Sequence, residues 1–211
     1  MRTMAFTGHR PNDFGGYNEE SMMIITVKHA LLRAITKAIA KGYTRFISGM
    51  ALGVDTWAAE AVLKAKEEFP DIKLIAAIPM LYQYQKWPEA SQKRWHDIVS
   101  KADEIYVTSF EISTEDKLIT YAELCRRINE KVEAGEVLAS WSASQWLCNR
   151  NHWMVNHCEV LFGVWTGKKT GGTYECLEYA RKSKVKTVVY DPTFVTYRVY
   201  YLPEAGIKET E

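Results

Sequence analysis

Residues 47–55, ISGMALGVD, join a short apolar run to the beginning of an expected helix and contain two glycines, Gly49 and Gly53. Glycine lets the chain turn sharply between a strand and a helix because it has no Cβ. The same absence lets backbone N–H groups approach a bound group, and a helix N-terminus favours an anion. Asp55 is expected to cap this helix. The stretch therefore predicts a strand–turn–helix unit that is either purely structural or phosphate-binding.

Strand-like and helical patterns alternate outward from this stretch. The expected strands cover residues 3–8, 45–49, 73–79, 104–109, 159–165 and 187–191. The expected helices cover residues 19–42, with Gly42 as its C-terminal cap, and 55–69, 91–102, 142–158 and 173–184. This alternation predicts an α/β fold, a Rossmann-like doubly wound and mostly parallel sheet with helices on both faces. Such sheets bind ligands at the carboxyl ends of their strands.

Length and composition favour one cytoplasmic domain. The 211 residues suit a single domain spanning 1–211, and the net charge of +1 gives no overall attraction to DNA or to a membrane. No apolar run reaches the length of about 20 residues that spans a bilayer, and the first residues lack the apolar core of a secretory signal. The 4 cysteines contain no Cys-x-x-Cys pair and are expected to be reduced thiols.

The segment 116–145 interrupts the alternation. It has apolar residues near helical spacing and predicts an inserted helix or hairpin. Three interpretations stay open: a lid over the strand ends, a contact between subunits, or an amphipathic helix packed on the same core. The inserted segment and the aromatic residues favour a homo-oligomer.

Two further turns resemble the first. Residues 165–180, WTGKKTGGTYECLEYA, place Gly171, Gly172 and Thr173 before a helix, with Lys168 and Lys169 nearby. Residues 7–11, TGHRP, place Gly8, His9 and Arg10 after the first strand, and arginine suits bidentate phosphate binding. Three such turns on one sheet should converge on one crevice that suits a nucleotide or a sugar phosphate. Asp55 would there be a helix cap or an acceptor for a ribose hydroxyl or an amine.

Four stretches in order, TGHRP, ISGMALGVDTWAAEAVL, RNHWMVNHCEVLFGVW and TGGTYECLEYA, resemble the YpsA-like members of the SLOG superfamily. That superfamily includes the Smf/DprA Rossmann domain and the LOG-type phosphoribohydrolases. The resemblance implies a Rossmann-like domain that binds a nucleotide-like ligand such as NAD or ADP-ribose. The positions matching the family's site, together with His9 from the first loop, are Gly8, His9, Arg10, Ser48, Gly49, Gly53, Asp55, Arg150, Asn151, Trp165, Gly171, Gly172 and Thr173.

The sequence departs from the LOG-type pattern at the position of the catalytic glutamate. That position is Cys176 here, and no proline precedes the glycines. Glu175 and Glu178 flank it out of register and are the weak catalytic candidates. We therefore expect a binder, either a sensor or a sequestering protein, with a nucleoside-phosphate N-glycosidase as the alternative. A DNA-binding accessory domain is a third reading, disfavoured by the net charge of +1.

Other reactive side chains favour simpler interpretations. Cys148 and His152 are four residues apart, with His157 and Cys158 nearby, but a complete ligand set for zinc is not evident, so no metal is expected. His9 is a possible general base, although a hydrogen bond within its loop or stacking on the ligand suits it better. Cys176 is expected to be a buried, inert thiol.

Overall fold

A computed structural model describes residues 1–108, 118–135 and 140–200 of the chain. Within these ranges the strands form one eight-stranded sheet in the order β5-β4-β3-β2-β1-β6-β7-β8. The strands are β1 (Arg2–Gly8), β2 (Tyr43–Ser48), β3 (Lys73–Ile78), β4 (Glu104–Val107), β5 (Leu118–Ile119), β6 (Val160–Val164), β7 (Lys186–Asp191) and β8 (Thr196–Tyr200). All neighbouring pairs are parallel except β4 with β5 and β7 with β8, so the sheet is mostly parallel, as predicted.

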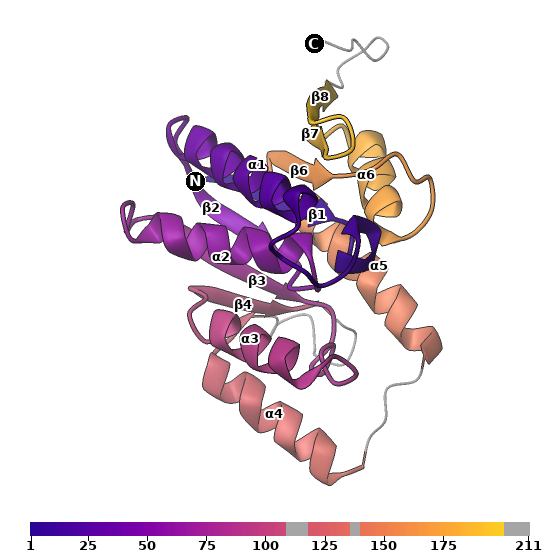
Figure 1. Ribbon diagram of the computed structural model, residues 1–211. Helices are drawn as coiled ribbons and strands as arrows, with labels where there is room; N and C mark the ends of the chain where they lie inside the picture. The colour runs from indigo at the N-terminus through magenta and orange to yellow at the C-terminus, as the bar shows by residue number, and fades with distance from the viewer. Residues whose placement is uncertain (109–117, 136–139, 201–211) are drawn as a thin grey trace.

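Helices cover both faces of the sheet (Figure 1). The helices α1 (Met22–Ile39), α2 (Val54–Lys66) and α3 (Glu89–Val99) lie on one face, and α5 (Ser140–Asn156) and α6 (Gly172–Lys182) lie on the other. A short 3-10 helix, η1 (Pro11–Phe14), follows β1, and α4 (Tyr121–Glu133) lies beside α3. The predicted Rossmann-like arrangement is thereby confirmed. None of the helices in the described ranges is long and apolar enough to cross a membrane.

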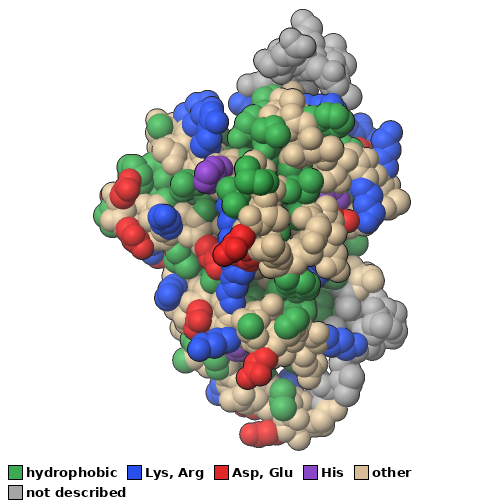
Figure 2. All heavy atoms as spheres, viewed as in Figure 1, with side chains coloured by type: hydrophobic (Ala, Val, Ile, Leu, Met, Phe, Trp, Pro, Cys, Tyr) green, Lys and Arg blue, Asp and Glu red, His purple; other side chains and the backbone are tan. Residues whose placement is uncertain are grey.

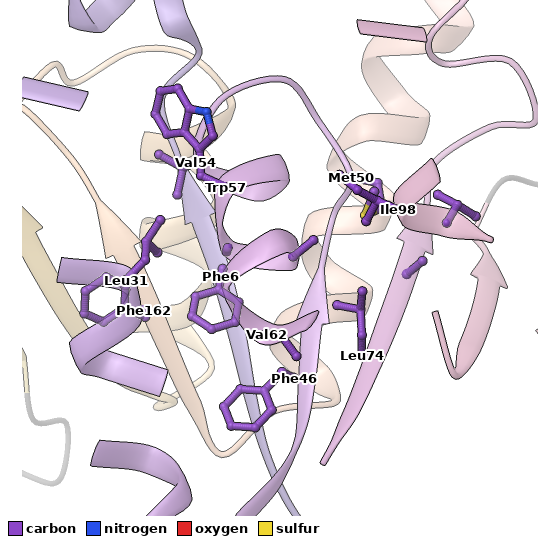
Figure 3. Close-up of a cluster of buried hydrophobic side chains, with 14 of the residues drawn as sticks. Phe6, Leu31, Phe46, Met50, Val54, Trp57, Val62, Leu74, Ile98 and Phe162 are labelled. Carbon is purple, nitrogen blue, oxygen red and sulfur yellow. The ribbon is translucent and has the colours of Figure 1, made fainter. Parts of the chain in front are cut away.

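The alternation of side chains along each strand divides the core into two layers. Phe6, Phe46 and Phe162 point from neighbouring strands toward α1 and α2, where Leu31 and Val62 lie in the same cluster (Figure 3). The intervening strand residues, such as Ala5, Ile47 and Leu161, point to the opposite face. There they pack in a second cluster with Met154 of α5 and Cys176 of α6. Strands buried on both faces explain the nearly continuous apolar runs in the sequence.

Several predicted boundaries were wrong. Helix α1 ends at Ile39 with Ala40 as its cap, because Gly42 adopts its left-handed conformation (φ 79°) two residues later. The cap of α2 is Gly53, and Asp55 lies inside the first helical turn. Strand β8 was missed, since its pairing with β7 depends on a turn that the sequence pattern did not reveal.

The inserted segment contains more structure than one helix. The range 116–145 includes β5, α4 and the first turns of α5, while residues 116–117 and 136–139 lie outside the described residues. Leu124 and Ile128 are buried on one side of α4 and belong to the core layer of α1–α3. This contact favours the reading of α4 as an amphipathic helix packed on the same core.

An ion-pair network fixes the loop that precedes α1. The carboxylate of Glu19 accepts hydrogen bonds from Arg94 on α3, from Lys28 on α1 and from the indole of Trp57 on α2 at 2.8 Å. Arg94 also donates to Glu60. Partial burial raises the pKa of Glu19, but the three donors outweigh it and bring that pKa to about 2. Three helices are thus joined through one carboxylate.

We expect Glu19→Gln to reduce the free energy of unfolding by about 1–2 kcal/mol at pH 7, because the network is partly solvated. The folded-state pKa lies below the ordinary value of 4.5, so the stabilisation is present above that pH and is lost as the pH falls toward 2. Urea unfolding at pH 7 and pH 3 measures the difference. The matched control is Glu20→Gln, an exposed neighbour outside the network. An equal loss in both variants, or a loss that does not change with pH, would contradict the assignment.

Candidate functional site

A crevice opens at the carboxyl ends of β1 and β6, which are neighbours in the sheet. The chain leaves β1 toward β2 on one side and leaves β6 toward β7 on the other, so this is the topological switch point of the sheet. The crevice has a volume of about 250 Å³. Three groups of residues line it, from the loop after β1, from the start of α2 with α5, and from the turn before α6.

The turn before α6 presents unoccupied backbone donors. Gly171 adopts φ 86°, a conformation that favours glycine, and leads directly into the helix. In the described part of the chain, the amides of Gly172, Thr173 and Tyr174 form no hydrogen bond. A Cβ on Gly172 would come no nearer than 3.8 Å to another residue, so this side of the turn is open. The arrangement suits an anion at the positive end of the α6 dipole.

Cationic side chains line the same crevice as this turn. Arg10 is exposed, lines the crevice and forms no ion pair among the residues that the structure describes. Lys168 donates to Asp13 at 3.1 Å. The imidazole of His9 is buried, with Nε2 3.1 Å from the Thr166 hydroxyl and Nδ1 3.8 Å from Asp13. Burial lowers the pKa of His9, with Asp13 opposing and Lys168 adding to the change, which favours the neutral ring.

The floor of the crevice is a buried pair of opposite charges. The guanidinium of Arg150, on α5, donates to the carbonyl of Gly49 and lies 3.4 Å from the carboxylate of Asp55. Asp55 also accepts a hydrogen bond from the amide of Ala51 at 3.3 Å. Burial raises the pKa of Asp55, and the charge of Arg150 opposes that change. The predicted helix-capping role of Asp55 is replaced by these contacts.

Asn151 connects the floor with the turn before α6. Its side-chain oxygen accepts a hydrogen bond from Arg150 Nε at 3.0 Å, and its Nδ2 donates to the carbonyl of Gly172 at 3.2 Å. The same Nδ2 is 3.1 Å from Glu175, whose other carboxylate oxygen lies 2.6 Å from His152 Nε2. The neighbouring residues Arg150 and Asn151 thus position both glycine turns.

Several predicted site residues support the crevice without lining it. The hydroxyl of Ser48 donates to the carbonyl of Asp55 at 2.8 Å and accepts from the amide of Met50 at 3.1 Å. Gly49 and Gly53 allow close contacts with Arg150 and with the backbone of His9. The ring of Trp165 is stacked against that of Tyr174, with centroids 6.1 Å apart. Its indole N–H donates to the carbonyl of Lys168. Gly8, His9, Arg10, Asp55, Arg150, Asn151, Gly171, Gly172 and Thr173 all line the crevice.

The two glutamates lie outside the crevice lining. Glu175 is held by Asn151 and His152, and Glu178 is paired with Arg181 on the outer side of α6. Burial raises the pKa of Cys176 to about 12, which agrees with an inert thiol. Cys148 and His152 do not join a larger set: the described residues hold no group of three or more His, Cys, Asp or Glu side chains that could hold a metal ion.

The crevice also contains residues that were not predicted. Asp13, Ala51, Leu147 and Thr170 line it, and Thr166 contacts His9 beside it. Asp13 lies in η1, whereas the sequence predicted only a loop after the first strand. The spacing of His9 and Asp13, four residues apart, was the available signal for that pair.

The fold and this crevice define an α/β protein with a polar, partly cationic crevice at the switch point of a Rossmann-like sheet. Comparison with known families identifies the class more closely. The model of the YspA SLOG family matches residues 4–124, which is more than half of the chain. The chain belongs to this family.

Relatives of this chain carry the name UPF0398 protein. One from Halalkalibacterium halodurans is 36% identical over 103 residues, covering 49% of this chain and 54% of the relative. One from Brevibacillus brevis is 30% identical over 126 residues, covering 56% of this chain and 67% of the relative. One from Bacillus thuringiensis is 33% identical over 105 residues, covering 50% and 57%. The match thus spans between about half and two thirds of these relatives.

We expect Gly53→Ala to destabilise the protein far more than Gly42→Ala. Both glycines have positive φ, 89° and 79°, so both substitutions carry the backbone cost of about 1 kcal/mol. A Cβ at Gly53 would also stand 2.6 Å from the carbonyl oxygen of His9, whereas one at Gly42 meets nothing within 4 Å. Urea unfolding of the two variants measures the excess, which we expect to be about 1–3 kcal/mol. Equal losses of unfolding free energy in the two variants would show that the contact between Gly53 and the carbonyl of His9 is not tightly packed.

Proposed function

We propose that this protein binds a nucleotide or nucleotide-derived small molecule in the crevice, as a sensor or a sequestering protein in the cytoplasm. The observation that supports this most is that one crevice combines groups that suit a phosphate with groups that suit hydroxyls and amines. The open amides before α6 suit a phosphate, and so does Arg10, which has no ion partner within the described ranges. The floor offers a carboxylate at Asp55 and an amide at Asn151, which suit hydroxyl and amine groups.

The charge distribution suggests how such a ligand would be oriented. A phosphate beside Asp55 would meet a carboxylate, although Arg150 balances that charge. A phosphate beside Thr173 would meet the hydroxyl, the amides of the turn and the side of the crevice that carries Arg10 and Lys168. We therefore infer that the phosphates lie toward α6 and that the ribose lies over Asp55.

Binding without turnover is favoured over N-glycosidic hydrolysis. A glutamate that acts as general acid or base must have its carboxyl free and within reach of the reacting bond. Glu175 already accepts from Asn151 and His152, and Glu178 is paired with Arg181. An enzyme built on this crevice would have to release Glu175 from both partners, so the hydrolase stays the alternative. Binding of nucleic acid is less favoured, because the net charge is +1; the homo-oligomer stays a prediction.

We expect Arg10→Ala and Gly172→Val each to abolish the thermal shift produced by a nucleotide ligand. Arginine supplies a phosphate contact, and a valine side chain at 172 would project into the open side of the turn. The panel is NAD, ADP-ribose, cyclic ADP-ribose, AMP and cyclic dinucleotides, since a ligand that binds only the folded protein raises the melting temperature. The shift is measured by scanning fluorimetry on the intact chain.

The control variant is Arg181→Ala, which removes an exposed arginine from the far end of α6. We expect it to retain the full shift, and all three variants to melt cooperatively without ligand. A panel that shifts the parent chain but equally shifts Arg10→Ala and Gly172→Val would exclude this crevice as the binding site. Chromatography of the ligand after incubation separates the two functions: unchanged ligand supports a binder, and a released free base supports the hydrolase.

A further inference from the structure

A second cavity lies at the opposite end of the molecule, between α1 and strands β1, β6, β7 and β8. Its volume is about 310 Å³, which is within the range of small-ligand sites. Most of its wall is apolar and is formed by Met4, Val160, Phe162, Val188, Tyr197 and Val199. These side chains share one face of the sheet, because they alternate with residues that point toward α5 and α6.

This cavity exists because the helices do not cover the whole face. Helix α2 packs on β1, β2 and β3, α1 lies beside α2 on the side toward β6, and α3 lies farther away, beside β4 (Figure 1). The part of the face formed by β7 and β8 therefore has no described helix above it. Tyr197 keeps 38% of its surface exposed, and its ring stands 4.9 Å from that of Tyr190.

Cations line the helical side of the cavity. Arg33, Lys37 and Lys41 follow one another at four-residue spacing on and just beyond α1, so they lie on one face of that helix. None of the three forms an ion pair in the described ranges of the chain, and Lys186 lines the cavity from β7. Figure 2 shows Lys and Arg side chains beside hydrophobic ones at the end of the molecule where α1 and β8 lie.

The carboxylate of Glu159, the residue before the cavity-lining Val160, is already paired. Glu159 is paired with Arg2 at 3.0 Å, and the Arg2 guanidinium lies over the ring of Tyr43, 4.0 Å from its centroid. The charge of Arg33 reaches the cavity wall, where it opposes the rise that burial causes in the pKa of Tyr197. Among the described residues that line the cavity, the charged side chains are all cationic.

We propose that this cavity binds a small amphiphilic anion, an unbranched alkyl chain with a terminal carboxylate. The apolar wall would take the chain, and the carboxylate would lie among Arg33, Lys37 and Lys41. The charges favour an anion over a neutral or cationic apolar molecule. The cavity volume of about 310 Å³ suits one small molecule. This site is separate from the crevice and does not depend on the function proposed there.

The test is calorimetric titration of the intact chain with hexanoate, octanoate and decanoate. We expect the affinity to rise roughly tenfold for each added pair of methylenes, as apolar burial requires, until the cavity is full. Decylamine, which has the same chain length and a positive charge, should bind at least about tenfold more weakly than decanoate. No binding, or equal binding of decanoate and decylamine, would overturn the proposal, including the case in which the chain or a second copy occupies the cavity.

Two variants locate the site. Lys37→Glu should weaken decanoate binding about threefold to tenfold, whereas Lys64→Glu, an exposed lysine on α2 away from the cavity, should leave it unchanged. Ala34→Phe should fill the cavity and abolish binding. If Ala34→Phe does not fold, the comparison of Lys37→Glu with Lys64→Glu still shows whether decanoate binds at the cavity. Arg10→Ala should not change decanoate binding, and an effect there would move the anion to the crevice and overturn the proposal.

Discussion

The buried guanidinium of Arg150 is the contact on which the geometry of the crevice depends. Arg150 is only 6% exposed, and its guanidinium lies between the carbonyl of Gly49, the carboxylate of Asp55 and the side-chain oxygen of Asn151. Removing one partner of such a pair leaves an uncompensated charge in the protein, which costs about 3–5 kcal/mol. Through this one side chain, α5 holds the loop between β2 and α2, and through Asn151 it also holds the turn before α6.

This contact gives the two glycine turns different roles. The turn before α2 is filled by its own protein groups: Arg150 and Asp55 occupy it, and the amide of Val54 bonds the carbonyl of His9 at 3.4 Å. In the turn before α6, Asn151 bonds the carbonyl of Gly172, but the amides of Gly172, Thr173 and Tyr174 have no partner among the described residues. Similar sequence patterns therefore produce one turn that shapes the crevice floor and one whose amides are open to the crevice, because only the first is filled by Arg150 and Asp55.

The sequence predicted the sheet and the crevice more accurately than the contacts inside it. Strands buried on both faces have apolar runs, and helices have periodic ones, so these elements follow from local patterns. The position of Arg150 does not, because it depends on how a helix remote in sequence packs against the loop after β2. Asp55 shows the same limit: its spacing after Gly53 fitted a helix cap, and only the approach of Arg150 and Ala51 assigned it to the floor. Strand β8 is recognisable only through its pairing with β7.

A net charge near zero also says little about affinity for anions in this protein. Several carboxylates are already committed to arginines within the fold: Glu19 to Arg94, Glu104 to Arg45 and Glu178 to Arg181. Arg10 in the crevice and Lys37 at the apolar cavity have no such partner in the part of the chain described by the structure. Since a paired charge contributes little field at a distance, the unpaired cations determine the local potential. Two anion-favouring surfaces can therefore coexist in a chain whose total charge is +1.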